Sequence, residues 1–240
     1  MSILKISKKC PLLFAMVIFF IVTEFALSLA EGMTQAMPEY KSETIRLPEP
    51  VHDSNTSIEE ALRKRRSIRD YKDGPLTRAE ISQLLWAAQG ITSQRGLRTA
   101  PSAGALYPLE IYIVSGNVYD LPDGVYKYQP RKHELTGLAD GDKRNELCNA
   151  ALGQSSVRNA AAVMVISAVY ERTTVKYGDR GIQYVHMESG HAAQNVFLQA
   201  VPLNLGVVVI GAFYDDAVKK VLKMPVNEQP LYIMPVGRMN

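Results

Sequence analysis

One uninterrupted apolar run limits the folds open to this chain more than any other feature. Residues 161–169 read AAVMVISAV, and every side chain in the run except that of Ser167 is apolar. A strand with one face in water alternates apolar and polar residues, whereas a strand covered on both faces reads as a continuous apolar run. The run therefore predicts a central strand in a sheet that carries other structure on both of its faces.

The rest of the chain predicts helices and strands in irregular order. Ser57 and Thr77 each stand three residues before a glutamate, which is the spacing of a capping box at a helix N-terminus. Pro202 predicts a kink or an early end in the longest helix. Because helices and strands do not alternate in regular βαβ units, the sequence favours an α+β layered domain. The predicted helices span 57–63, 77–90, 140–152, 181–204 and 215–222, and the predicted strands span 109–115, 124–129, 133–138, 161–169, 206–210 and 231–236.

The first thirty residues have the composition of a targeting segment. Lys5, Lys8 and Lys9 precede the apolar stretch 11–23, and the tripeptide SLA that ends at Ala30 has the small residues that a signal peptidase needs. An uncleaved anchor is the alternative, because the apolar stretch is nearly long enough to span a bilayer. We expect a signal peptide or N-terminal membrane anchor over 1–30, a polar linker or wrapped arm over 31–56, and a folded domain over 57–240.

Composition and motifs exclude several classes of function. The N-terminal segment holds three of the 27 Lys and Arg residues and one of the 24 Asp and Glu residues, so the remainder is close to neutral. It lacks the basic surface of a nucleic-acid-binding protein. Cys148 is the only cysteine after residue 30, which excludes an internal disulfide and favours a buried structural thiol. The chain has no Rossmann, Walker or H-E-x-x-H motif, and the spacing of its four histidines predicts no metal site.

A cluster of arginines follows the first predicted helix. Residues 65–69 read RRSIR, which places three guanidiniums and one hydroxyl within five residues. Arginine grips phosphate oxygens in pairs, and serine can add a hydrogen bond, so the run is suited to an anion site. The alternative is a solvated basic face that the run shares with Arg63 and Lys64.

Two further segments are candidates for the same site. The loop 101–108 (PSAGALYP) is rich in small residues, which let a backbone approach a flat ligand, and Ser102 can bind a polar edge of that ligand. Arg238 stands just beyond the last predicted strand, in the sequence PVGR. Taken alone, residues 101–108 can form an ordinary loop, and Arg238 can be a surface arginine.

Taken in order, these motifs resemble the nitroreductase family of FMN flavoenzymes. The closest resemblance is to its SagB-type branch, which includes thiazoline and oxazoline oxidases. It rests on RRSIR, PSAGALYP, ESGHAAQN at 188–195, GVVVIGAF at 206–213 and the terminal PVGR, and it covers about Ser57 to Arg238. It implies an α+β fold with a mixed sheet flanked by helices, and an intertwined homodimer with two FMN sites at the subunit interface.

The resemblance also implies contacts with the cofactor. Ala105 stands where the family often has an asparagine that contacts the cofactor. The phosphate and ribityl segment is matched by Arg65, Arg66, Ser67 and Arg69, and a second phosphate contact is matched by Arg238. The loop that the partner subunit contributes is matched by Pro101, Ser102 and Ala103. The backbone edge at the reactive face of the flavin is matched by Ile210 and Gly211.

Catalysis and dimerisation are further implications of the resemblance. Lys176 and Tyr177 match a Lys-Tyr pair that the SagB-type branch has on the substrate side of the flavin. Such a pair can act as general acid or base while hydride moves to or from flavin N5, although a solvated loop pair is the alternative. Gly190, Ala192 and Ala193 favour close packing of the long helix in a dimer, with a helix buried inside one subunit as the alternative.

Two functions remain open at this point. The first is an FMN-dependent oxidoreductase that transfers hydride between the flavin and a small molecule or peptide, with NAD(P)H as one candidate reductant. The second is an exported flavin-binding protein without turnover. The sequence does not identify the substrate, because a resemblance at the level of a fold does not fix it.

The targeting segment yields a prediction about location. The positive-inside tendency places Lys5, Lys8 and Lys9 in the cytoplasm and the domain outside it, either exported or tethered to the membrane. Fractionation of cells that express the chain with a C-terminal tag should find the tag in the membrane or exported fraction. A matched chain that begins at Glu31 should stay in the cytoplasm. An intact N-terminus on a soluble cytoplasmic protein would contradict the prediction.

Overall fold

The computed structural model describes residues 43–239, so the predicted targeting segment 1–30 and the first part of the predicted linker lie outside the described residues. No helix in 43–239 is both long and apolar enough to cross a bilayer. The strands are β1 (Thr44–Arg46), β2 (Leu76–Thr77), β3 (Leu109–Ser115), β4 (Val118–Tyr119), β5 (Gly124–Gln129), β6 (Glu134–Asp140), β7 (Ala162–Ala168), β8 (Leu205–Val207) and β9 (Gln229–Arg238).

The helices complete the α+β architecture that the sequence predicts. The cap of α3 is a full capping box, in which Thr77 and Glu80 each accept a hydrogen bond from the other's backbone N–H. At α2 the Ser57 hydroxyl accepts from the backbone N–H of Glu60 at 3.1 Å. The α-helices are α2 (Ile58–Lys64), α3 (Arg78–Gln89), α4 (Arg144–Ala150), α5 (Ser155–Asn159), α6 (Glu171–Tyr177), α7 (Arg180–Ala200) and α8 (Asp215–Leu222), and a short 3-10 helix η1 spans Ala103–Ala105.

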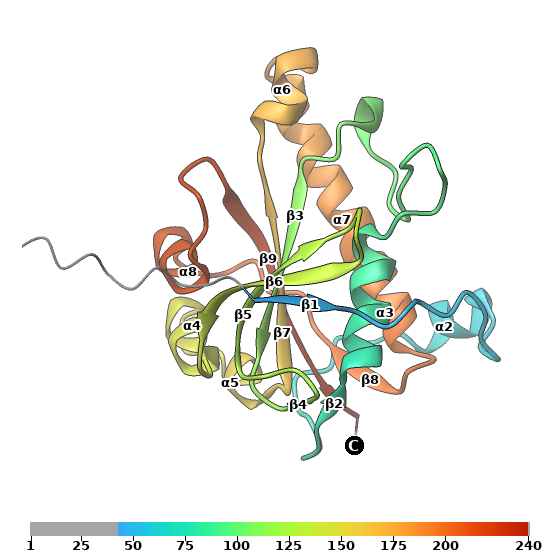
Figure 1. Cartoon of the computed structure of the whole chain (residues 1–240), viewed down its shortest axis with the longest axis vertical. Helices are drawn as coiled ribbons and strands as arrows, with labels where there is room; N and C mark the ends of the chain where they lie inside the picture. The colour runs from blue at the N-terminus through green and yellow to red at the C-terminus, as the bar shows by residue number, and fades with distance from the viewer. Residues whose placement is uncertain (1–42, 240) are drawn as a thin grey trace, which may run out of the picture. The chain divides into compact units, whose positions relative to one another are not determined.

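The main sheet has seven strands in the order β1-β6-β5-β3-β7-β9-β8 (Figure 1). Neighbouring strands in it run antiparallel, as β3 and β9 do on either side of β7. Parallel pairing occurs between β2 and β4 and at a single bridge from Ser67 to Val207. Strand β7 is central and fully buried, which confirms the prediction from its apolar run.

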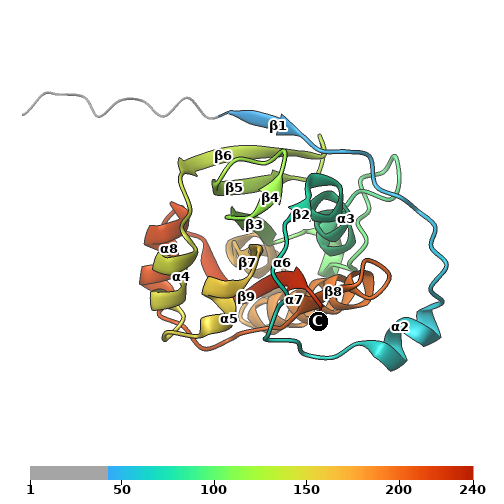
Figure 2. The same ribbon diagram turned by 90° about the horizontal axis from the view of Figure 1, so that it is seen from below.

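Alternate residues of β7 enter two hydrophobic cores. Met164 and Ile166 lie in the first core, which also contains residues of α3 and α7. Val163 and Val165 lie in the second, which contains residues of α4, α5 and α8. Figure 2 shows α4, α5 and α8 on one side of the sheet and α3 and α7 on the other. Both faces of the sheet are therefore covered, as a continuous apolar strand requires.

Several boundaries differ from the sequence prediction. The body begins before Ser57, because Ile45 of β1 and the adjacent Leu47 are buried and β1 pairs with β6 at the edge of the sheet. Helix α7 ends at Ala200, ahead of Pro202, which confirms the predicted early end. Helices α5 and α6 were not predicted, since each is too short for a helical pattern to stand out.

The arginine run lies across the ends of β8 and β9. The backbone N–H of Ile68 donates to the Val207 carbonyl at 2.9 Å. Two glycines make room for this crossing: a Cβ on Gly206 would lie 2.7 Å from the Ile68 side chain, and a Cβ on Gly237 would lie 2.5 Å from the Tyr71 ring. Side chains do not approach this closely, so the glycines set the path of residues 65–71.

Gly237→Ala tests this packing. The new methyl group should push the Tyr71 ring away and lower the free energy of unfolding by about 1–3 kcal/mol, the usual cost of overpacking. Val226→Ala is the matched control, because the Val226 side chain is 90% exposed and its truncation removes no buried contact. Urea unfolding of both variants measures the difference. Equal stability of Gly237→Ala and the unaltered chain would contradict the packing argument.

Candidate functional site

The arginine run presents cations that have no acidic partner. The Arg65 guanidinium lies 5.1 Å from the centre of the Phe197 ring on α7. One nitrogen of Arg66 donates to the carbonyls of Arg63 and Arg65, at 3.0 and 2.7 Å. Within residues 43–239, no ion pair involves Arg65, Arg66 or Arg69. A cluster of uncompensated guanidiniums is suited to a phosphate.

Two cavities adjoin this run. One, of about 160 Å³, is lined by Arg65 and Arg66 together with Phe197 and Ala200 of α7. The other, of about 400 Å³, lies against residues 67–70. The predicted phosphate segment therefore borders open space at the C-terminal end of α7.

Arg238 lies nearby, but its guanidinium is already engaged. The backbone N–H of Lys72 donates to the Arg238 carbonyl at 3.0 Å, which brings this strand end beside the arginine run. The guanidinium itself donates to both carboxylate oxygens of Glu80, at 2.5 and 2.9 Å, and to the Pro75 carbonyl. As arranged, Arg238 ties β9 to the start of α3 and does not join the free guanidiniums.

Ile210 and Gly211 lie on the same edge of the sheet as the arginine run. Ile210 exchanges two backbone hydrogen bonds with Ile233 of β9, at 2.8 and 2.9 Å. Gly211 is exposed, and a Cβ there would meet no atom within 4 Å. Three residues of extended chain, about 10 Å, separate Ile210 from Val207, which contacts the arginine run. An elongated ligand with its phosphate at the arginines can therefore reach Gly211.

A cavity of about 380 Å³ adjoins Gly211 and contains two residues that the sequence did not single out for chemistry. Tyr170 and His186 lie in its wall together with Phe213, and the Tyr170 hydroxyl is 3.2 Å from His186 Nε2. Their 16-residue separation follows no motif, so no sequence signal pointed to this pair. Only the α6–α7 connection brings them together.

The loop 101–108 has an unusual backbone. Gly104, Ala105 and Tyr107 have φ angles of 62°, 54° and 49°. Left-handed backbone costs a residue with a side chain roughly 1–2 kcal/mol, so Ala105 and Tyr107 are strained. Asparagine tolerates this conformation better than alanine does, so the family's usual asparagine suits the backbone at position 105. The Ser102 hydroxyl stabilises the loop by accepting a hydrogen bond from the Tyr107 N–H at 2.9 Å.

Side chains of helix α6 contact this loop. A Cβ on Gly104 would lie 2.8 Å from the Tyr177 hydroxyl and 2.9 Å from Lys176 Nζ, so both side chains contact the loop at its glycine. Arg172 of the same helix donates to the Tyr107 carbonyl at 3.1 Å. The structure thus brings together the predicted Lys-Tyr pair and the loop that contains Pro101, Ser102 and Ala103.

A buried carboxyl on α7 lies beside the loop. Glu188 of α7 is only 2% exposed. Burial raises its pKa to about 7, while a hydrogen bond from Ser102 and the positive charge of Arg98 oppose that rise. The motif ESGHAAQN contains Glu188, but no sequence signal separates this residue from the other polar residues of the helix.

Helix α7 separates the two groups of candidate residues within one subunit. Successive residues of an α-helix are rotated by about 100°. His186 beside Gly211 and Phe197 beside Arg65 therefore point in nearly the same direction. Tyr184, which packs edge-on against Tyr177 at 5.1 Å, points about 160° away from His186. In Figure 1, α6 and the neighbouring loop lie at one end of α7 and α2 lies at the other.

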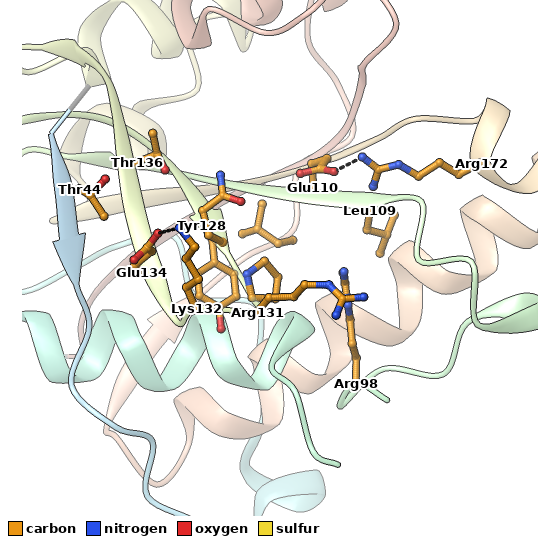
Figure 3. Close-up of a pocket in the computed structure, with 13 residues that line it drawn as sticks. Thr44, Arg98, Leu109, Glu110, Tyr128, Arg131, Lys132, Glu134, Thr136 and Arg172 are labelled. Carbon is orange, nitrogen blue, oxygen red and sulfur yellow. Dashed lines mark ion pairs between the residues drawn. The ribbon is translucent and has the colours of Figure 1, made fainter. Parts of the chain in front are cut away.

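Another cavity contains none of the predicted site residues. It has a volume of about 550 Å³ and lies against β3, β5 and β6 (Figure 3). Its carboxylates are already paired: Glu110 with Arg172 at 2.5 Å and Glu134 with Lys132 at 3.4 Å. Arg98, which lies beside the loop, also lines it. The polar character of this cavity reflects paired surface charges and does not point to the flavin.

FMN fits the residues on the Gly211 side of α7. The free guanidiniums can hold one phosphate, and the open backbone at Gly211 lets a flat ring approach closely. Among residues 43–239, no group of three His, Cys, Asp or Glu side chains is arranged to hold a metal ion. Cys148 is buried in α4, as expected for a structural thiol.

The amino-acid sequence is similar to those of several known proteins. MJ1384 of Methanocaldococcus jannaschii, a protein named as a nitroreductase, is 51% identical over 181 residues, which cover 75% of this chain and 90% of that protein. The microcin B17-processing protein McbC of Escherichia coli is 28% identical over 149 residues. That match covers 60% of this chain, which spans only about half of McbC, namely 55%.

Solved structures share the fold. A protein of Ralstonia eutropha that is named as a nitroreductase has a TM-score of 0.73 and 27% identity, and the match covers 84% of this chain and 92% of the other. The NADPH:FMN oxidoreductase of Vibrio harveyi, in complex with NAD+, has a TM-score of 0.56 and 25% identity, with coverages of 76% and 69%. The family model described as "Nitroreductase family" matches residues 62–238. The chain therefore belongs to the nitroreductase family and is an oxidoreductase.

Proposed function

We propose that this chain is an FMN-dependent oxidoreductase of the SagB type. The observation that carries the proposal is the row of uncompensated cations at Arg65, Arg66 and Arg69, fixed to the same sheet edge as Gly211. In this proposal the three arginines and Ser67 bind the phosphate and ribityl chain. Ile210 and Gly211 then face the flavin ring. The similarity to a flavin oxidoreductase from Vibrio harveyi supports the choice of cofactor.

We further propose that the protein is a homodimer in which each flavin site uses both subunits. On α7, Tyr184 beside the Lys-Tyr pair and His186 beside Gly211 point about 160° apart, which puts the loop and Gly211 on different sides of this helix. A second copy related by a two-fold axis near α7 would present its loop to the first copy's arginines and Gly211. Because Lys176 and Tyr177 contact the loop at Gly104, the pair would serve the same flavin as the loop. Dimers with isologous interfaces are the commonest oligomers.

The proposed reaction is hydride transfer between flavin N5 and an organic substrate. FMN, when bound, supplies the ring that accepts and returns hydride. Lys176 or Tyr177 takes the second hydrogen as a proton when a substrate is dehydrogenated, and returns it in the reverse direction. The arginines orient the cofactor and keep positive charge near it. NAD(P)H is the candidate reductant, and the similarity to a microcin-processing protein supports a peptide as one candidate substrate.

A flavin-binding protein without turnover is the rival function. It predicts a yellow protein whose flavin is neither reduced by NAD(P)H nor reoxidised by any acceptor, whereas the enzymatic proposal predicts both half-reactions. The absorbance spectrum of the purified protein, recorded before and after addition of NADPH and then of a quinone, distinguishes the two functions. We also propose, from residues 1–30, that the domain acts outside the cytoplasm or at the membrane.

The phosphate assignment is tested by removing one guanidinium. Arg65→Ala should weaken FMN binding by about 1.5–3 kcal/mol, the scale of a hydrogen bond to a charged group. This corresponds to roughly a 10- to 150-fold rise in Kd. Arg158→Ala, an exposed residue of α5, is the matched control. Fluorescence titration of apoprotein with FMN measures both, and an unchanged affinity in Arg65→Ala would contradict the assignment.

Arg238→Ala decides whether Arg238 is a second phosphate contact. If it is, FMN affinity should fall as in Arg65→Ala. If Arg238 only anchors α3 through Glu80 and Pro75, the variant should unfold more easily but keep its FMN affinity when folded. Titration and urea unfolding on the same sample separate the two roles.

Shared sites are tested by mixing two defective subunits. Arg65→Ala impairs the phosphate segment, and Ala103→Glu places a bulky negative charge in the loop, so neither homodimer should be filled at an FMN concentration that just saturates the unaltered protein. If the loop acts across the interface, the mixed dimer has one intact site and one doubly damaged site. It should bind one FMN per dimer. A mixed dimer, isolated through two different tags, that binds no FMN would show that each site belongs to one subunit.

The role of the Lys-Tyr pair is tested by separating chemistry from binding. Lys176→Ala and Tyr177→Phe should keep FMN, because the phosphate is held by the arginines. Oxidation of a thiazoline-containing peptide should slow by about 10²–10⁴-fold, the usual contribution of general acid–base catalysis. Reoxidation by a quinone, which needs little proton positioning, should change far less. If both rates are unchanged, the pair has no catalytic role, and if FMN is lost, the pair supports the cofactor site.

A further inference from the structure

Three buried polar atoms below the loop lack hydrogen-bond partners. They are Glu188 Oε1 on α7, Gln89 Nε2 on α3 and Nε of Arg98, which lies three residues before the loop. Glu188 is 2% exposed, and Gln89 is fully buried. The large majority of buried side-chain polar atoms in proteins have a hydrogen-bond partner. Three unpaired atoms that flank one loop therefore need an explanation, and none of them belongs to the proposed phosphate or hydride chemistry.

A chain of contacts links these residues to the strained loop. Arg98 donates to Gln89 Oε1 at 2.7 Å and lies 4.5 Å above the centre of the Tyr107 ring. The Tyr107 N–H donates to the Ser102 hydroxyl, which in turn hydrogen-bonds to the Glu188 carboxyl. Through these contacts Glu188 supports a loop whose Ala105 and Tyr107 have unfavourable backbone angles.

We propose that Glu188 is a positioning residue: as a neutral carboxyl it holds the loop 101–107 in the observed conformation, and its ionisation releases the loop. A carboxylate needs hydrogen-bond donors on both oxygens, and Oε1 has none here, so the observed arrangement suits the neutral form. Arg98 Nε and Gln89 Nε2 are donors without acceptors. An ionised Glu188 would draw the Arg98 guanidinium away from Tyr107 and Gln89, and the loop would lose both contacts.

The surrounding charges support a transition near neutral pH. Burial raises the pKa of Glu188 to about 7, against the opposing effects of Ser102 and Arg98. Burial lowers the pKa of Arg98 itself, whereas the negative charge of Glu110 on β3 raises it and the positive charge of Arg172 on α6 lowers it. Since the pKa of Glu188 is raised from 4.5 in the observed arrangement, that arrangement should be fully stable below about pH 4.5 and should weaken as the pH rises from there through about 7. If the loop contacts FMN as proposed above, FMN affinity should weaken over the same range.

The experiment compares Glu188→Gln with Glu146→Gln, an exposed glutamate on α4. Glutamine keeps the shape of a neutral carboxyl and cannot ionise. Hydrogen exchange of residues 98–107 in apoprotein, corrected for the intrinsic effect of pH, is measured from pH 5 to pH 8. Protection should fall in the unaltered chain and in Glu146→Gln, and should stay constant in Glu188→Gln. FMN Kd should rise about tenfold between pH 5 and pH 8 where Glu188 can ionise, because the ionised form that accumulates over this range no longer holds the loop.

Each outcome bears on a separate claim. If the loop of the unaltered chain and that of Glu188→Gln respond equally to pH, the positioning role is wrong. If loop protection depends on pH in the unaltered chain but not in Glu188→Gln, and FMN binds at no pH, the positioning role stands and the proposed cofactor is wrong. Should Glu188→Gln not fold, carbon-13 NMR of glutamate carboxyls in the unaltered chain decides, because titration of Glu188 near pH 4.5 would overturn the proposal.

Discussion

The arrangement of the candidate site depends on one rigid element, helix α7. Its 21 residues form a rod about 30 Å long, and its two faces contact different halves of the site. Phe197 and His186 lie on the side of the arginines and Gly211, while Tyr184 and Glu188 lie on the side of the loop. In the proposed dimer, each flavin would therefore meet the arginines of one subunit and the loop of the other.

The two halves are also held by different kinds of force. The arginine run is positioned by backbone hydrogen bonds and by glycines that admit Ile68 and Tyr71, so its charges stay unpaired and available. The loop 101–107 is strained, and polar contacts from α3, α6 and α7 hold it in place. The position of the arginine run, which is fixed by packing, should not depend on pH. The position of the loop should depend on pH, because in our proposal a buried carboxyl holds it.

The sequence predicted what is encoded by local patterns. The apolar run of β7, the capping residues Ser57 and Thr77, and Pro202 each have a short-range physical meaning, and each correctly predicted a local feature, although only Thr77 forms a full capping box. Ordered motifs gave the family. The orientation of Arg238 was not predictable, because its partner Glu80 lies 158 residues away and also caps α3. The pairs Tyr170–His186 and Ser102–Glu188 likewise depend on long-range packing, and a single sequence carries no signal for it.

The contact between Gly104 and the Lys-Tyr pair restricts how the active site can be assembled. Gly104 has no side chain, and the Lys176 and Tyr177 side chains occupy the space that a Cβ would fill. Arg172 of the same helix also holds the Tyr107 carbonyl. In the proposed active site, the loop and the pair would therefore move together and serve the same ligand. A loop loosened by ionisation of Glu188 would carry Lys176 and Tyr177 with it, so proton chemistry at the substrate and the protonation of a buried carboxyl below the loop would be coupled through a single strained segment.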